Sequence, residues 1–139
     1  MGRAIERRCR PFGLKTIHKN RNPLSAVEAE APEYVPFDEL LSKSDFISAS
    51  EPLNAKTKHL VGTVEIAKMK PSVVIINTAR GAVKDEAAKT DALEEGHITT
   101  VGLDVFEGEP KINVKLLKQE LAFMVSHIGT HTVETLAKM

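Results

Sequence analysis

Three groups of polar side chains have the types and spacing needed for proton chemistry on a small anion. Arg80 follows the apolar run at residues 73–76, an acidic loop spans residues 104–109, and His127 follows another apolar stretch. Arginine binds a carboxylate or a phosphate through a planar, always charged group. A histidine beside a carboxylate can donate or accept a proton near neutral pH. Together these residues indicate acid–base chemistry on an anionic substrate.

These side chains can act together only if the secondary structure brings them close to one another. The run at residues 73–76 holds four β-branched residues in a row, which predicts a strand buried on both faces, as in parallel sheets covered by helices. Shorter apolar stretches predict further strands at residues 14–18, 34–35, 46–49, 100–105 and 121–125. Helices are predicted at residues 2–10, 25–30, 38–41, 62–70, 85–96 and 113–119.

Strands that alternate with helices predict one α/β domain with a doubly wound parallel sheet. In such sheets, ligands bind outside the carboxyl ends of the strands. If the last three strands are adjacent, Arg80, the loop at residues 104–109 and His127 share one edge of the sheet.

Composition excludes several classes of function. The chain has 139 residues, a net charge of zero and a single cysteine, Cys9, so it has no internal disulfide and fits a reducing, cytoplasmic compartment. No apolar run approaches the ~20 residues that span a bilayer. Residues 1–22 hold seven Lys and Arg against the single acid Glu6. We considered a transit peptide there, but this segment leads directly into a predicted strand and contains no serine. We expect no nucleic-acid partner, because no aromatic platform accompanies the basic residues.

His127 and His131 are four residues apart, a spacing that can bind a metal on a helix. Gly129 lies between them, and no acid or cysteine ligand is nearby in the sequence. We therefore expect no metal site.

Three segments carry a resemblance to a known family: "VVIINTARGAVKDEAA", "DALEEGHITTVGLDVFEGEP" and "SHIGTHTVET". They resemble the NAD(P)-binding domain of the D-isomer-specific 2-hydroxyacid dehydrogenases, and within that family the glyoxylate/hydroxypyruvate reductases of fungi. The resemblance covers essentially the whole chain and implies a Rossmann-type fold.

The resemblance also implies catalytic roles. Arg80 matches the arginine that orients the carboxylate and carbonyl of a 2-oxo acid. His127 matches the general acid that protonates the carbonyl oxygen during hydride transfer, and Glu109 matches the carboxylate that pairs with this histidine. Asp104 matches the aspartate that contacts the nicotinamide carboxamide.

The cofactor implied is NADP(H) in preference to NAD(H). A fold that prefers NAD usually places an acid after the second strand, to hold the ribose hydroxyls. Residues 18–22 contain no acid and two cations, and Arg21 matches the arginine that meets the extra phosphate in NADPH-using relatives. The expected cofactor-binding residues are Gly2, Arg3, Asn20, Arg21, Pro52, Thr78, Ala79, Asp104 and Gly129.

The match to the family pattern is incomplete. Only the last glycine of the Gly-rich fingerprint is present, as Gly2, so we expect a sheet that lacks its first strand. We interpret residues 1–139 as a partial NAD(P)-binding domain without the substrate domain. Several residues also depart from the family pattern: Glu51, Lys84, Lys89 and Thr90 replace apolar residues, and Ser126 replaces a proline.

Two functions follow. The first is NAD(P)H-dependent reduction of a small 2-oxo acid, glyoxylate or hydroxypyruvate, with little activity expected from residues 1–139 alone. The alternative is a non-catalytic truncated copy that binds nucleotide weakly or only associates with a full-length subunit. The resemblance further implies a homodimer.

Overall fold

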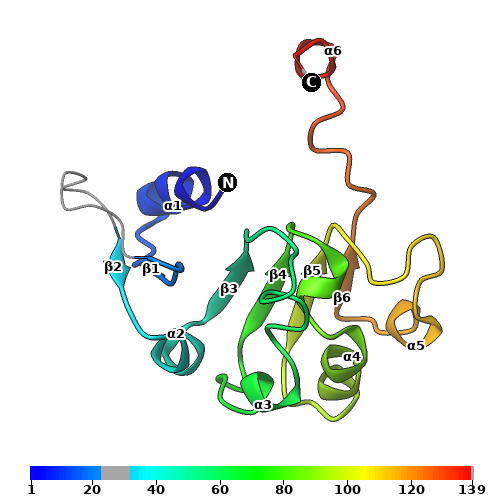
Figure 1. Cartoon of the computed structure of the whole chain (residues 1–139). Coiled ribbons are helices and arrows are strands. Elements are labelled where there is room, and N and C mark those ends of the chain that lie inside the picture. The colour runs from blue at the N-terminus through cyan, green and yellow to red at the C-terminus, as the bar shows by residue number, and fades with distance from the viewer. Residues whose placement is uncertain (23–31, 139) are drawn as a thin grey trace.

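The computed structural model describes residues 1–22 and 32–138, and this part of the chain contains two parallel sheets (Figure 1). One sheet has two strands in the order β1-β2, and the other has four strands in the order β3-β4-β5-β6. Every pairing is parallel, as the sequence predicts. The strands are β1 (Ile17–His18), β2 (Glu33–Tyr34), β3 (Phe46–Ala49), β4 (Val74–Asn77), β5 (Thr100–Leu103) and β6 (Ala122–Met124).

Short helices connect the strands. The clearest helical boundary is at Asp85, whose side chain accepts the Ala88 N–H and so caps α4, while Gly96 follows that helix with a φ of 73°. No helix in the described residues is long and apolar enough to cross a membrane. The helices are α1 (Gly2–Cys9), α2 (Phe37–Lys43), α3 (Thr63–Ile66), α4 (Glu86–Glu94), α5 (Val114–Leu117) and α6 (Val133–Leu136), with the 3-10 turns η1 (Arg10–Phe12) and η2 (Gly81–Val83).

Several predicted boundaries were wrong. The strand predicted at residues 14–18 contains only β1, because β2 offers two partner residues. The helix predicted at residues 62–70 ends at Ile66, beyond which the N–H groups of Lys68 and Met69 bond three residues back in tighter turns. The predicted helix at residues 25–30 lies outside the described residues.

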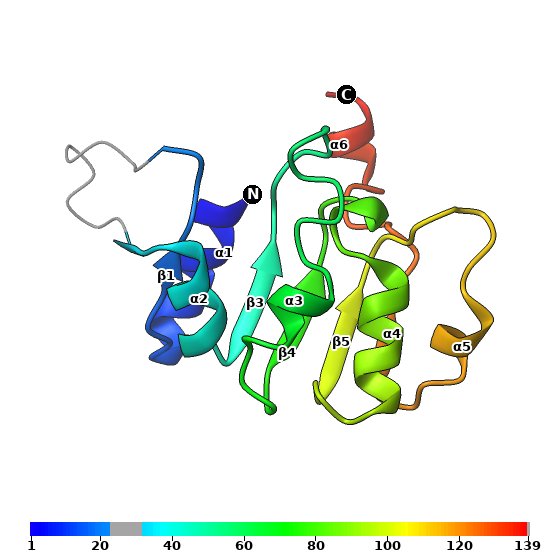
Figure 2. The same ribbon diagram turned by 60° about the horizontal axis from the view of Figure 1, so that its bottom comes forward.

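Helices α3 and α4 cover one face of the four-stranded sheet (Figure 2). Alternate strand residues point into this layer, where Ile47, Ile75, Val101 and Leu103 are buried against Ile66 and other core residues. On the opposite face, Phe46 and Phe123 are exposed at the two edges of the sheet. The core of this sheet therefore lies mainly on the α3–α4 face, and the parallel sheet covered by helices agrees with the predicted α/β fold class.

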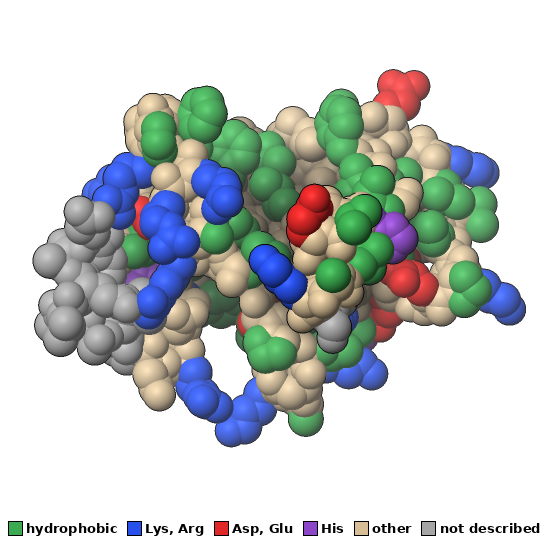
Figure 3. Space-filling view, turned by 90° about the horizontal axis from the view of Figure 1, so that it is seen from above, with side chains coloured by type: hydrophobic (Ala, Val, Ile, Leu, Met, Phe, Trp, Pro, Cys, Tyr) green, Lys and Arg blue, Asp and Glu red, His purple; other side chains and the backbone are tan. Residues whose placement is uncertain are grey.

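The amino-terminal part of the chain forms a separate group of elements. Helix α1 and the β1-β2 sheet lie beside β3 in Figure 1, but no strand pairing joins β1 to β3. The amino end of α1 lies near the carboxyl end of β3, since a Cβ built on Gly2 would lie 4.0 Å from the Ser50 Cβ. Basic side chains gather on this side of the molecule (Figure 3).

Candidate active site

Arg80 lies in a turn that β4 delivers and Asn77 holds. The buried Asn77 side chain donates to the Arg80 carbonyl at 3.0 Å and accepts the Ala79 N–H at 3.1 Å. Gly81 follows, and a Cβ there would lie 1.9 Å from the Phe106 carbonyl oxygen. The turn therefore packs backbone against backbone on the loop after β5. The guanidinium itself is exposed and donates to the Ala79 carbonyl at 2.7 Å.

Glu109 lies in the loop after β5. Its carboxylate accepts the Phe106 N–H at 2.8 Å, closing a short turn around Gly108, which has a φ of 80°. The loop is tied back to α4, because the Glu107 N–H donates to the buried Glu86 carboxylate at 2.9 Å. In this conformation, the Glu109 carboxylate is hydrogen-bonded within its own loop.

His127 follows β6 in a segment that leaves the sheet (Figure 1). Its Nδ1 lies 2.9 Å from the Asp104 carboxylate, and its side chain is 54% exposed against 19% for Asp104. Asp104 is fixed in turn by its N–H, which donates to the Asn77 carbonyl at 3.0 Å. The carboxylate that holds the imidazole here is thus Asp104, whereas the sequence resemblance assigns that position to Glu109.

Arg80, Glu109 and His127 nevertheless line one cavity of about 310 Å³, together with Gly81, Val105 and Phe106. The three catalytic candidates come from the carboxyl ends of β4, β5 and β6, which are adjacent and parallel. The shared sheet edge expected from the sequence is therefore present. The arrangement offers a cation for a carboxylate and an imidazole whose free Nε2 can serve a proton transfer.

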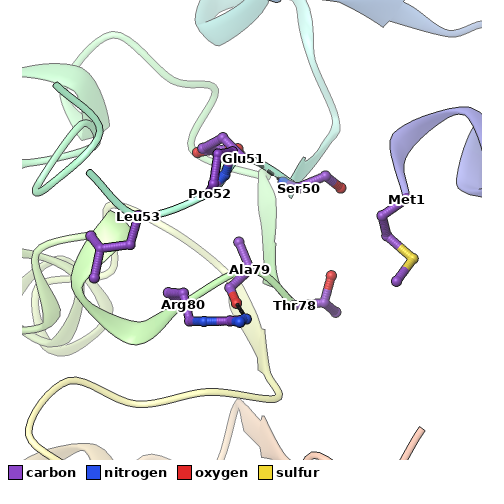
Figure 4. Close-up of a pocket in the computed structure, with 8 residues that line it drawn as sticks. All are labelled: Met1, Ser50, Glu51, Pro52, Leu53, Thr78, Ala79 and Arg80. Carbon is purple, nitrogen blue, oxygen red and sulfur yellow. Dashed lines mark hydrogen bonds between the residues drawn. The ribbon is translucent and has the colours of Figure 1, made fainter. Parts of the chain in front are cut away.

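A second cavity of about 470 Å³ lies between α1 and the carboxyl ends of β3 and β4 (Figure 4). Three of the expected cofactor-binding residues, Pro52, Thr78 and Ala79, line it. No role was predicted for Met1, Ser50 and Leu53, although the place of Ser50 directly after a strand could have marked it; Arg80 was predicted as a catalytic residue. The remaining lining residues are Met1, Ser50, Glu51, Leu53 and Arg80.

The donors around this larger cavity fit a dinucleotide. The first N–H groups of a helix lack intrahelical partners and attract phosphate, and α1 begins at the cavity with Gly2. The Ser50 hydroxyl is buried without a hydrogen-bond partner in the described structure, while the Ser50 N–H donates to Glu51. Pro52 and Leu53 supply an apolar wall for a ring.

The other expected cofactor residues lie outside this cavity. Asn20 and Arg21 are exposed after β1, and Arg3 is exposed on α1. Gly129 lies in the exposed segment beyond His127, and a Cβ there would meet nothing within 4 Å.

Two lysines are buried beside the Arg80 turn. Lys84 is 1% exposed, and its Nζ donates to the Ile76 carbonyl at 3.3 Å. Its pKa is lowered to about 7, mainly by burial and also by the nearby charge of Lys89, while Glu51 acts in the opposite direction. The pKa of Lys89 is also lowered by burial, against the influence of Glu86 and other acids. These are the lysines that the sequence comparison marked as replacing apolar residues.

His59 links the loops around the site. The imidazole Nε2 lies 2.8 Å from the Glu107 carboxylate, and Nδ1 lies 3.9 Å from the Asp85 carboxylate. The backbone N–H of His59 donates to the Ala82 carbonyl at 2.9 Å. The loops after β3, β4 and β5 are therefore joined. The sequence analysis gave His59 no role, since none of these partners is near it in the chain.

The comparisons with known proteins agree with this geometry. Residues 1–129 match the family model described as "D-isomer specific 2-hydroxyacid dehydrogenase, NAD binding domain". Glyoxylate reductase 1 of Saccharomyces cerevisiae is 51% identical over 140 residues, which cover 100% of this chain and 40% of that protein.

Solved structures show the same similarity. A glyoxylate reductase from Paecilomyes thermophila has a TM-score of 0.94 and 49% identity, covering 99% of this chain and 42% of that one. An NADPH-dependent glyoxylate/hydroxypyruvate reductase from Sinorhizobium meliloti, in complex with NADP and malonate, has a TM-score of 0.90 and 32% identity. The match covers 96% of this chain and 41% of that one.

The chain belongs to the D-isomer-specific 2-hydroxyacid dehydrogenase family, and residues 1–129 correspond to its NAD-binding domain. It spans about 40% of the length of the curated relatives it matches.

Proposed function

We propose that this chain is the NAD(P)-binding domain of an oxidoreductase that reduces a small 2-oxo acid, glyoxylate or hydroxypyruvate, to its 2-hydroxy acid. The observation that carries the proposal is the cavity lined jointly by Arg80, Glu109 and His127. The names of the relatives support the substrate class.

The residues divide the reaction between them. Arg80 binds the substrate carboxylate and orients the adjacent carbonyl. His127 Nε2 donates a proton to the carbonyl oxygen, while Nδ1 stays paired with an acid that stabilises the imidazolium. Asp104 holds Nδ1 in this structure. Rotation of the Glu109 carboxylate away from the Phe106 N–H would let Glu109 take over that role and free Asp104 for the cofactor carboxamide.

The cofactor lies in the larger cavity in this proposal. A reduced nicotinamide, when bound, supplies the hydride. Gly2 and Arg3 at the amino end of α1 would hold the pyrophosphate, Pro52, Thr78 and Ala79 would hold the rest of the dinucleotide, and Gly129 is a further proposed cofactor-binding residue. We favour NADP(H) because residues 18–22, at the end of β1, include Asn20 and Arg21 and contain two cations and no acid.

A chimera tests this function. Residues 1–139 replace the matching segment of S. cerevisiae glyoxylate reductase 1, and NADPH oxidation by glyoxylate is measured. We expect turnover, reduced by about 10²–10⁴-fold in His127→Ala, since a general acid typically contributes that much. Arg21→Ala should weaken NADPH binding more than NADH binding. A folded chimera that binds NADPH and shows no turnover would contradict the proposal.

A second candidate function is nucleotide binding without turnover, or association with a full-length subunit as one half of a homodimer of cofactor domains. The burial of Lys84 and Lys89 favours this second function, because charged groups in the core lower the stability of the domain. Isolated residues 1–139 should then bind NADPH without measurable reduction of glyoxylate. Sedimentation of the isolated chain shows its association state.

A further inference from the structure

His59 fastens the loop after β5 from outside the candidate site. Its imidazole Nε2–H donates to the Glu107 carboxylate at 2.8 Å, and its backbone N–H donates to the Ala82 carbonyl at 2.9 Å. Ala82 belongs to the η2 turn that follows Arg80. One residue therefore joins the turn that carries Arg80 to the loop that carries Glu109.

The backbone of His59 is left-handed, with a φ of 50°. Among the described residues other than glycine, His127 alone shares a positive φ, at 53°. Such residues are uncommon, and they persist where surrounding contacts fix them, often at functional sites. The His59 side chain is 40% exposed, so its contacts with Ala82 and Glu107, and not burial in a core, hold it in this conformation.

Glu107 is the point at which the loop is fastened. Its N–H donates to the buried Glu86 carboxylate at 2.9 Å, while its own carboxylate accepts from His59. Burial lowers the pKa of Lys89, and Glu86 and Glu107 oppose that change, so the buried amine is near the same acids. Asp85, 3.9 Å from Nδ1, is the other acid that faces the imidazole. The loop is therefore held on one side by a buried acid and on the other by a surface histidine.

The fastening at Glu107 gains importance because the proposed reaction breaks the other hydrogen bond within this loop. The Phe106 N–H is held by the Glu109 carboxylate in this structure. When Glu109 turns to His127, that N–H loses its partner and the short turn around Gly108 opens. The contacts of Glu107 then determine where the loop lies.

We propose that His59 is a positioning residue, which keeps the loop at residues 104–109 in place while Glu109 pairs with His127. His59 lines neither of the two cavities, so it acts through Glu107 and not by touching substrate or cofactor. The inference rests on the proposed function, since it assigns a role in the same reaction.

Two substitutions separate the side chain of His59 from its backbone. His59→Gln places an amide nitrogen the same number of bonds from Cα as Nε2, so it can donate to Glu107. His59→Asn is one bond shorter but adopts a left-handed backbone readily. A role through Glu107 predicts that glutamine substitutes for histidine and asparagine does not. A role of the backbone alone predicts the reverse.

Amide hydrogen exchange on the intact chain gives the first measurement. The Phe106 and Glu107 amides should exchange at least about tenfold faster in His59→Asn than in wild type, because the loop opens locally. In His59→Gln their exchange should stay close to the wild-type rate. The control is the Val101 N–H, which donates to the Leu121 carbonyl in the sheet and should exchange equally in all three proteins.

Turnover in the S. cerevisiae chimera gives the second measurement. His59→Asn should lower kcat by up to about 10²-fold, the effect of misplacing a catalytic group by about 1 Å, and should leave the KM for NADPH unchanged. His59→Gln should restore most of kcat. In a Glu107→Ala background, His59→Asn should have no further effect, because the two residues act as one unit.

Several outcomes overturn the proposal. Wild-type exchange and wild-type kcat in His59→Asn would show that the histidine positions nothing, and equal losses in both variants would remove the role of the donor to Glu107. A His59→Asn effect that persists without Glu107 would place its action elsewhere. Absence of turnover by the wild-type chimera would instead contradict the catalytic proposal, and the exchange of the Phe106 and Glu107 amides then decides the role of His59 alone.

Discussion

The two sides of the candidate site are built differently. Arg80 lies in a turn fixed by the buried Asn77 and by backbone contact between Gly81 and Phe106. His127 lies in an exposed segment, and its ring is held by the Asp104 carboxylate. The candidate site thus combines an arginine in an anchored turn with a loosely held histidine. Positions of the first kind should respond strongly to substitution, and positions of the second kind weakly.

The largest change in the free energy of unfolding is expected at Lys84, which is buried beside the anchored Arg80 turn. Because the pKa of Lys84 is about 7 in the folded chain against 10.5 as the ordinary value, protonation favours unfolding. The penalty is complete below pH 7 and fades as the pH rises toward 10.5. Lys84→Met should therefore stabilise the chain by roughly 5 kcal/mol at low pH and by progressively less above neutrality.

Denaturant unfolding between about pH 6 and about pH 10 measures this effect. Lys118→Met is the control, since Lys118 is exposed. A Lys84→Met gain that is constant across this range would show that the lysine is not neutralised by burial.

Gly81→Ala tests the backbone contact of the anchored side. A Cβ would lie 1.9 Å from the Phe106 carbonyl oxygen, so the loop after β5 must move. We expect a loss of about 3 kcal/mol in the free energy of unfolding, as in severe overpacking. Gly129→Ala, where a Cβ meets nothing within 4 Å, should change it by less than about 0.5 kcal/mol. Similar values for the two variants would remove the contrast between the two sides.

The smallest effect is expected on the exposed side. Asp104→Asn removes the charge next to His127, and the loss of stability should stay below about 1 kcal/mol because the imidazole is largely exposed. Thermal unfolding measures this change, with Glu95→Gln as the control for the exposed His97–Glu95 pair. A loss of several kcal/mol for Asp104→Asn would mean that His127 is anchored as firmly as Arg80.

The sequence predicts the parts of the fold that local pattern determines. Strand β4 comes from a run of β-branched residues, and alternate residues of β3 are buried. Polar residues follow both runs and mark where the strands end. The sequence analysis took the adjacency of β4, β5 and β6 as a condition for a shared edge, and the sheet order meets that condition. The cavity that collects Arg80, Glu109 and His127 could therefore be anticipated.

Other features depend on tertiary contacts that no local pattern carries. Lys84 and Lys89 occupy core positions, which composition alone would assign to the surface. The pairing of His127 with Asp104 depends on how the segment after β6 turns, where His127 has a φ of 53°.

Arg80 lines both cavities. A molecule that draws the guanidinium toward one cavity changes the charge that the other cavity presents. The two binding equilibria are then coupled, and the coupling free energy is the same whichever ligand binds first. An anion in the smaller cavity and a nucleotide in the larger one should therefore each alter the affinity measured for the other by the same factor.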